Sequence, residues 1–290
     1  MKKSVFSLIC IICSWVNISA QEHNCVDAES VLRSIDWGWS RMDDSHVEVG
    51  RASVEVFGSV QTISMVRFPM RRHAVSVVAS AGPSAMITSE FGVKNKALAA
   101  LNGGYFDGKL YPTTYVKDEG CVTGSSIADG VIRSNAMFRI KDKRGRKVDI
   151  VNVPDSLSTV AAARRWREAL VSGPVLIEDG EIVDYLNDPQ RARRKFYVDR
   201  HPRTILGYSS DGLIYFIVVD GRFPSKAEGM SIYELQALCS ALDLYEAVNL
   251  DGGGSSTLWT RDHGVVNHPS DNRRFDHKGE RRVPNVLIVE

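Results

Sequence analysis

The sequence has no strong bias of charge and, beyond its amino terminus, no long apolar run. Lysine and arginine number 36 against 35 aspartates and glutamates. This balance gives no general attraction to nucleic acid or to an anionic membrane. No stretch after residue 20 approaches the roughly 18 apolar residues of a membrane-spanning helix. We therefore predict no nucleic-acid partner and no membrane span, and any charge-based function must be local.

Cysteine is also scarce. Two of the five cysteines lie within the first 20 residues, which leaves Cys25, Cys121 and Cys239 in the rest of the chain. Three cysteines allow one disulfide at most, and the sequence does not say which pair would form it. Cys239 lies on the apolar side of an expected helix, so burial as a free thiol is at least as good an interpretation as a disulfide.

Zinc-binding motifs are absent as well. His263, His268 and His277 share one polar loop, but their spacing matches no zinc signature and no cysteine lies nearby. We therefore predict no metal site, and no other cofactor motif is present.

The first 20 residues differ from the rest. Lys2 and Lys3 precede an apolar run over 5–16, and the small residue Ala20 precedes Gln21. This pattern predicts a secretory signal peptide over 1–20 and an exported protein, periplasmic or secreted, whose mature chain begins at about Gln21.

The remaining sequence alternates short β-branched runs with two amphipathic segments, which predicts an α+β fold built on a mostly antiparallel or mixed sheet. We assign 21–70 to amino-terminal strands of uncertain grouping and 71–290 to one main domain. The apolar run over 213–219 predicts a central strand buried on both faces. The apolar spacing over 159–171 predicts a helix, and a capping box of Ser231 and Glu234 predicts a second helix over 231–242.

The most informative stretch is 247–259, which predicts a strand, a tight polar turn and another strand. Asn249 and Asp251 alternate with aliphatic residues, so both side chains should point away from the core. Three consecutive glycines, 252–254, allow backbone N–H groups to approach a ligand closely. Ser255 and Ser256 follow at once. An amide, an acid, bare N–H groups and hydroxyls together suit an anionic or polyhydroxylated substrate.

Other interpretations of this turn remain open. Asn and Asp before glycines also make ordinary hairpin turns. A phosphate-binding loop is disfavoured, because no Gly-x-x-x-x-Gly-Lys-Ser/Thr motif is present and 257–260 is typical of a strand.

The basic run 191–195 is best interpreted as a solvated loop, with a groove for an acidic polymer as the alternative.

Several other motifs, taken in order along the chain, resemble those of a known family. They are Asn102-Gly103-Gly104-Tyr105-Phe106, Ser172-Gly173-Pro174, Arg203-Thr204, Val219-Asp220-Gly221-Arg222, the helix with Glu234-Leu235, the stretch 249–257, and Arg282-Val283-Pro284-Asn285. With them, roughly residues 70 to 290 resemble the phosphodiester glycosidases related to the mammalian uncovering enzyme, N-acetylglucosamine-1-phosphodiester α-N-acetylglucosaminidase. The bulky segment 223–228 departs from the short Gly- or Ser-rich turn usual in that family.

The resemblance implies one α+β domain whose motifs converge on one cavity, and hydrolysis of the bond between a sugar and a phosphodiester. Such a substrate releases a phosphate monoester, whose second pKa near 6 reduces the need for a general acid. We expect Asp251 to act as base or nucleophile and Asp220 as second acid or orienting group. The phosphate would be clamped by Arg203 and Arg222 and cradled by Gly252, Gly253, Gly254, Ser255 and Ser256. The sugar hydroxyls or the carboxylates would be bound by Asn102, Asn249 and Asn285, with Gly103 and Tyr105 beside the substrate.

Two alternatives remain. A serine hydrolase would use Ser255 or Ser256, although no Gly-x-Ser-x-Gly elbow is present. A non-catalytic glycan-binding protein would keep the cavity but would not need Asp220 and Asp251 there. The expected partner is a carbohydrate phosphodiester. The sequence leaves the sugar, the aglycone, the anomeric outcome and the oligomeric state undetermined.

Overall fold

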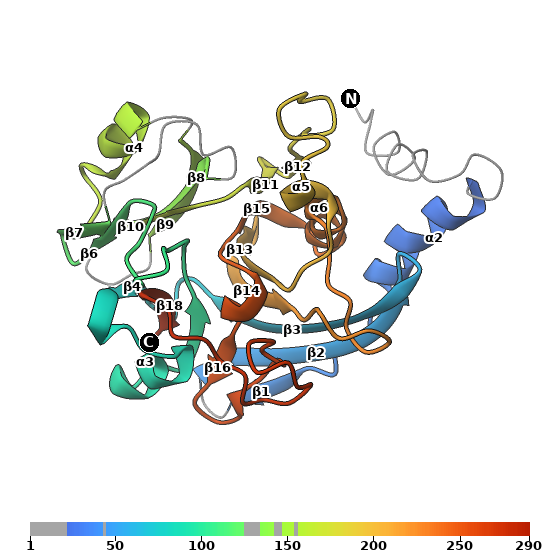
Figure 1. Cartoon of the computed structure of the whole chain (residues 1–290), viewed down its shortest axis with the longest axis horizontal. Coiled ribbons are helices and arrows are strands. Elements are labelled where there is room, and N and C mark those ends of the chain that lie inside the picture. The colour runs from blue at the N-terminus through green and yellow to red at the C-terminus, as the bar shows by residue number, and fades with distance from the viewer. Residues whose placement is uncertain (1–21, 43–44, 125–133, 142–146, 154–155) are drawn as a thin grey trace.

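The computed structural model describes residues 22–42, 45–124, 134–141, 147–153 and 156–290. The expected signal peptide lies outside this part of the chain. The described residues form an α+β fold dominated by antiparallel strands, as the sequence predicts (Figure 1). No helix in the described part is long and apolar enough to cross a membrane.

The largest sheet has eight strands in the order β1-β2-β3-β14-β13-β15-β11-β12. Its long strands are antiparallel neighbours, and in the view of Figure 1 β2 and β3 lie below β13 and β14. The strands of this sheet are β1 (Ser40–Met42), β2 (Val47–Val56), β3 (Ser59–Pro69), β11 (Val175–Glu178), β12 (Glu181–Ile182), β13 (Arg203–Ser209), β14 (Leu213–Val219) and β15 (Leu244–Asn249).

Two smaller sheets of five strands each complete the β-structure. One has the order β7-β6-β10-β8-β9 and the other β17-β16-β5-β18-β4. Their strands are β4 (Val75–Ala79), β5 (Ala99–Asn102), β6 (Val116–Asp118), β7 (Cys121–Gly124), β8 (Ala136–Ile140), β9 (Val148–Asn152), β10 (Glu168–Ser172), β16 (Leu258–Thr260), β17 (Gly264–Val265) and β18 (Asn285–Val289).

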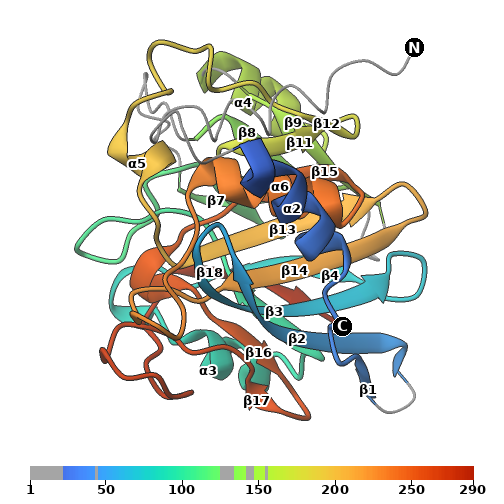
Figure 2. The same ribbon diagram turned by 90° about the vertical axis from the view of Figure 1, so that its right-hand side faces the viewer.

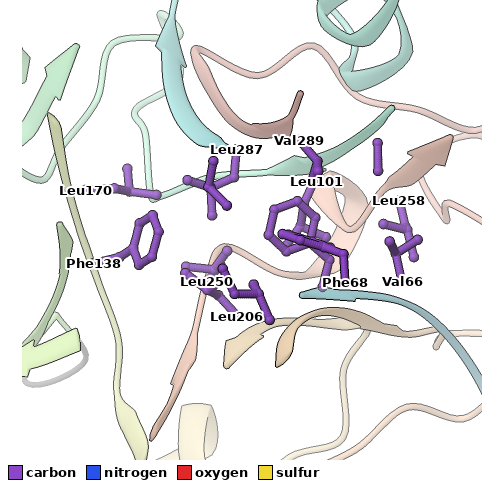
Figure 3. Packing of buried hydrophobic residues seen from close by; sticks show 14 of the residues in the cluster. Val66, Phe68, Leu101, Phe138, Leu170, Leu206, Leu250, Leu258, Leu287 and Val289 are labelled. Atoms are coloured by element: carbon purple, nitrogen blue, oxygen red, sulfur yellow. The ribbon is translucent and has the colours of Figure 1, made fainter. Parts of the chain in front are cut away.

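The main hydrophobic core lies where the three sheets face one another. Phe68 and Leu206 come from the eight-stranded sheet and Leu250 directly follows its strand β15, while Phe138 and Leu287 come from the two smaller sheets (Figure 3). All five side chains are nearly inaccessible to solvent. Burying an aliphatic or aromatic side chain of this size contributes roughly 1.5–3 kcal/mol, so this contact fixes the sheets relative to one another.

Helices cover the opposite face of the eight-stranded sheet. Figure 2 shows α2 and α6 lying over β13 and β14, and a second cluster of buried apolar side chains fills the space between them. The helices are α2 (Glu22–Arg33), α3 (Thr88–Lys94), α4 (Ser156–Ala163), α5 (Lys195–Val198) and α6 (Ile232–Ala241), with short 3-10 turns η2 (Gly82–Ser84) and η3 (Gly253–Ser255).

Several sequence-based predictions are confirmed. The run over 213–219 is β14, a central strand between β3 and β13. The helix expected over 231–242 is α6, and Ser231 and Glu234 form the capping box. Cys239 is a buried free thiol, and burial raises its pKa. Cys121 is also a free thiol but is exposed, whereas the side chain of Cys25 lies outside the described residues.

The helix predicted over 159–171 is wrong in its second half. The helix α4 ends at Ala163, and the chain turns into strand β10, which pairs with β6 and β8. All residues of β10 are buried. A strand buried on both faces loses the alternation that distinguishes it from a helix, so its apolar residues were indistinguishable from a continuation of the helical pattern.

Candidate functional site

The ends of two strands bring Asp220 and Asp251 to the same edge of the eight-stranded sheet. Strands β14 and β15 both pair antiparallel with β13, so the two strands run parallel to each other and end at the same edge. Arg203, the first residue of β13, pairs with Val219 and lies between the two strand ends. Two strand spacings separate β14 from β15, which is roughly 10 Å. Asp220 and Asp251 therefore follow strands that end on either side of the first residue of β13, Arg203.

Asn102, at the end of β5, ties this edge to a smaller sheet. Its Nδ2 donates to the Asp251 carbonyl oxygen at 2.7 Å, and its Oδ1 accepts from the Thr257 N–H at 3.0 Å and from the Thr204 hydroxyl at 2.9 Å. The Asp251 N–H in turn donates to the Gly103 carbonyl. Asn102 thus holds the main chain on both sides of the glycine turn, and it does so without bonding the Asp251 carboxylate.

Asn249 and Asn285 are buried in the same way. Asn249 was expected to point away from the core, but it is 1% exposed. Its Nδ2 donates to the carbonyls of Gly173 and Leu250 and to the Tyr105 hydroxyl. Asn285 Oδ1 accepts from the Gly104 N–H at 2.7 Å. The physical reason for the difference is that an amide can satisfy buried main-chain groups, so a polar residue at a strand end need not face solvent.

The glycine turn is shaped by its neighbours. Gly253 has a φ of +65°, and a Cβ there would lie 2.8 Å from Nη2 of Arg222. At Gly254 a Cβ would lie 2.5 Å from Nη2 of Arg281 and from Oδ1 of Asp271. The turn consequently admits charged side chains right against its backbone, and any residue other than glycine would displace them.

Arg222 is exposed, with its backbone in the left-handed region at a φ of 69°. Its guanidinium makes no ion pair or hydrogen bond within the part of the chain that the structure describes. Burial, Arg203 and Arg222 lower the pKa of the neighbouring His201 imidazole. Arg222 thus contributes positive charge beside the glycine turn, and it is open to an anion.

Arg203 does not share this openness. Its guanidinium donates through Nε to the Met230 carbonyl at 2.9 Å, and through Nη2 to the carbonyls of Phe196 and Asp199. The residue is 2% exposed, and burial lowers its pKa to about 10. This geometry does not fit the phosphate clamp expected from the sequence, because the guanidinium of Arg203 already donates to main-chain carbonyl oxygens.

Asp220 is also fully engaged. Its Oδ1 accepts from Asn267 Nδ2 at 3.0 Å and from the His268 N–H at 2.9 Å, and its Oδ2 bonds His268 Nδ1 at 2.8 Å. The residue is 1% exposed. Of the two roles that the sequence left open for Asp220, this arrangement favours the orienting one.

Asn267 was not among the residues singled out from the sequence, and His268 was considered only as a zinc ligand and set aside. A signal was present nonetheless, because Val265-Val266-Asn267 repeats the pattern of an apolar run that ends in asparagine, as in 97–102 and 247–249. Asn267 Nδ2 also donates to the Ser256 carbonyl. The loop after β17 therefore belongs to the same site as the glycine turn.

The serine residues of the turn are poorly placed for nucleophilic chemistry. Ser255 and Ser256 are 0% and 1% exposed. Ser256 Oγ lies 3.2 Å from the Thr204 hydroxyl, and Ser255 Oγ has no partner among the described residues. A serine nucleophile needs a base within hydrogen-bond reach, and neither hydroxyl contacts a histidine among the residues that the structure describes.

Comparison with known proteins identifies the class to which this α+β architecture belongs. A family model described as phosphodiester glycosidase matches residues 95–290. Similar proteins include the mouse N-acetylglucosamine-1-phosphodiester alpha-N-acetylglucosaminidase, which is 27% identical over 66% of this chain. The bovine protein of that name is 30% identical over 41% of this chain. The matches span only 37% and 24% of those two relatives.

Solved structures agree on the fold. The zebrafish N-acetylglucosamine-1-phosphodiester alpha-N-acetylglucosaminidase catalytic domain, auto-inhibited by its pro-peptide, superimposes with a TM-score of 0.65 at 22% identity, covering 86% of this chain and 85% of that one. Since the family model covers most of the chain, the chain belongs to the phosphodiester glycosidase family.

Proposed function

We propose that this protein is an exported hydrolase that cleaves the bond between the anomeric carbon of a sugar and a phosphodiester. Family membership supports the reaction class, and the amino-terminal pattern of 1–20 supports export. The observation that carries the proposal is the juxtaposition at the glycine turn. There, the main chain of Asp251 is held two residues before Gly253, and Gly253 faces Arg222, whose guanidinium is open to a phosphate.

In this proposal each charged residue has one task. Asp251 is the carboxylate that acts at the anomeric carbon. Arg222 binds the departing phosphate, because a guanidinium matches two phosphate oxygens at once. The phosphate monoester leaves with little need for a proton, so the usual pair of catalytic carboxylates is reduced to one. Asp220 orients its neighbours from a buried position.

The buried asparagines then serve the site indirectly. Asn102 holds the main chain of Asp251, and Asn249 and Asn285 hold the segments 173–174 and 103–104 against it. The sugar would rest against the groups that this framework positions, including Gly103, Tyr105 and the 252–254 backbone. The burial of Ser255 and Ser256 gives the serine-hydrolase alternative no support.

The purified protein should be assayed on synthetic sugar-1-phosphodiesters, with product analysis by mass spectrometry. We expect a free sugar and a phosphate monoester, and a far lower rate on the matching alkyl glycoside, which lacks a phosphate leaving group. Binding of the phosphodiester without turnover would instead support a glycan-binding protein.

A further inference from the structure

The His268 ring is held by a carboxylate and by two neighbouring rings, while its second ring nitrogen has no partner among the described residues. Its Nδ1 bonds Asp220 Oδ2 at 2.8 Å. The ring of Phe275 stacks on it at a centroid distance of 3.8 Å and an interplanar angle of 10°, and His277 lies at 4.5 Å. Within the described part of the chain, Nε2 has no hydrogen-bond partner, and the side chain is 20% exposed.

The contacts of Asp220 decide which ring nitrogen carries the proton. Its Oδ1 already accepts two N–H groups, so the carboxylate is used as an acceptor. Oδ2 then accepts the Nδ1 proton of His268. In a neutral imidazole this leaves the lone pair on Nε2, which is the arrangement that a general base requires.

The residues on either side of His268 contact the glycine turn. The preceding residue, Asn267, donates to the Ser256 carbonyl at 3.0 Å, and Ser270 Oγ reaches the Gly253 carbonyl at 3.5 Å. The segment 267–270 therefore lies against the glycine turn, whose Gly253 also faces Arg222 and follows Asp251 by two residues.

We propose that His268 is the general base of the reaction and that Asp220 is its positioning residue. This inference rests on the proposed function. Nε2 takes a proton from water, the water oxygen bonds to the anomeric carbon, and that carbon's bond to the phosphate oxygen breaks with its electron pair leaving on the phosphate. The imidazolium, stabilised by Asp220, then returns the proton to solvent. Asp251 stabilises the positive charge that develops at the anomeric carbon.

A purely structural role would not explain all of these contacts. Asn267 Nδ2 and the His268 N–H already anchor the loop to Asp220. The imidazole adds a third bond to Asp220 and contacts the rings of Phe275 and His277, while Nε2 has no partner among the described residues. The titratable groups that face the ring are Asp220 and His277, and Lys226 lies beyond it over the ring of Phe275.

The first test compares His268→Ala with His263→Ala, an exposed histidine of the same carboxyl-terminal region whose partner among the described residues is Thr260. We expect kcat/KM to fall by roughly 10²–10⁴ in His268→Ala and to be unchanged in the control. Wild-type kcat/KM should decline as imidazoles become protonated at acid pH, and His268→Ala should lose that decline. Added imidazole should restore part of the activity. A loss of less than twofold, or a loss uniform with pH and not rescued, would overturn the proposal.

The second test does not depend on turnover. In Asp220→Asn the new carbonyl can still accept from Asn267 and His268 N–H, but the amide nitrogen would donate to Nδ1. ¹⁵N NMR of histidine-labelled protein should then show the Nδ1–H tautomer of His268 in the wild type and the Nε2–H tautomer in Asp220→Asn. A wild-type Nε2–H tautomer would overturn the assignment of the base. Failure of the wild type on every sugar-1-phosphodiester would instead contradict the proposed function, while the tautomer still decides the state of His268.

Discussion

At the scale of single residues, the Asp251 side chain can be changed without disturbing the main chain that holds it. Its N–H bonds the Gly103 carbonyl, and its carbonyl accepts from Asn102, and neither contact involves the carboxylate. Asp251→Asn should therefore fold normally but lose about two orders of magnitude or more in kcat. Circular dichroism and steady-state kinetics check both parts. A variant that keeps full activity would remove Asp251 from the mechanism.

Alanine substitutions of the two arginines that were predicted to bind phosphate should differ in their effect on stability. Arg203→Ala leaves one buried and two partly buried carbonyls without this donor, and hydrogen bonds from a charged group are worth about 1.5–3 kcal/mol each. We expect it to lower the free energy of unfolding by about 3 kcal/mol or more. Arg222→Ala removes an exposed side chain and should change stability by no more than about 0.5 kcal/mol.

Activity should show the opposite order. Arg222→Ala should reduce kcat/KM on a sugar-1-phosphodiester by tenfold or more, on the order of 1.4 kcal/mol, and should affect an alkyl glycoside far less. Urea unfolding and kinetics on both substrates measure the pair. Equal losses on the two substrates in Arg222→Ala would show that Arg222 does not act on phosphate.

Several residues of this site could be predicted from the sequence, but the contacts that define their roles could not. Asn102, Asp220, Asn249 and Asp251 were found because each lies at or just beyond the end of an apolar run. Their roles depend on partners far along the chain, as with Asp220 and His268, whose positions differ by 48. A pattern of neighbouring residues carries no record of such contacts. The engagement of Arg203 by main-chain oxygens was hidden for the same reason.

At the scale of elements, α6 was predictable because its signals are local. Ser231 Oγ accepts from the Glu234 N–H, and Glu234 Oε2 accepts from the Ser231 N–H. Ser231→Ala should lower the free energy of unfolding by about 1 kcal/mol, within a range of roughly 0.5–2 kcal/mol. Urea unfolding measures this change, and kcat should not move, because the cap lies outside the catalytic residues.

A matched control lies in the last turn of the same helix. Ser240→Ala removes a hydroxyl that caps nothing, so its effect on stability should stay near zero. If both serine variants lost the same stability, the capping contact would not be the cause.

The strand β10 could not be predicted from the residues next to it in the sequence. Its residues Glu168 to Ser172 are all buried, and the strand forms only because β6 and β8 lie on either side of it. Strand pairing of this kind depends on distant segments, such as Lys117, which pairs with Ala169, and Phe138, which pairs with Leu170. The helical pattern that precedes β10 is genuine but ends at Ala163.

At the scale of the whole molecule, two carboxylates join the smaller sheets. Glu168 on β10 accepts from the Val77 N–H of β4 at 2.5 Å, and Asp118 on β6 accepts from the Ala79 N–H at 2.9 Å. Both N–H groups lie on the open edge of β4, the last strand of its sheet. The contacts cover an edge that would otherwise be free to pair with another chain.

This junction should make stability depend on pH. Burial, with a smaller contribution from Asp118, raises the pKa of the Glu168 carboxyl to about 7, although the Val77 N–H opposes the shift. The folded state thus binds the proton more tightly than the unfolded state, whose carboxyl titrates near 4.5. The contribution of Glu168 is therefore fully present below about pH 4.5 and is lost as the pH rises through about 7.

Glu168→Gln isolates this effect, because the amide oxygen can still accept from Val77 but cannot ionise. Relative to wild type, the variant should be nearly neutral at pH 4.5 and more stable at pH 8, by on the order of 1–2 kcal/mol. Urea unfolding of both proteins at several pH values measures the difference, in which other titrating groups such as Glu246 cancel. A difference that does not change between pH 4.5 and 8 would show that the Glu168 carboxyl keeps an ordinary pKa. A variant less stable at pH 8 would show that the ionised form is the one that holds the sheets together.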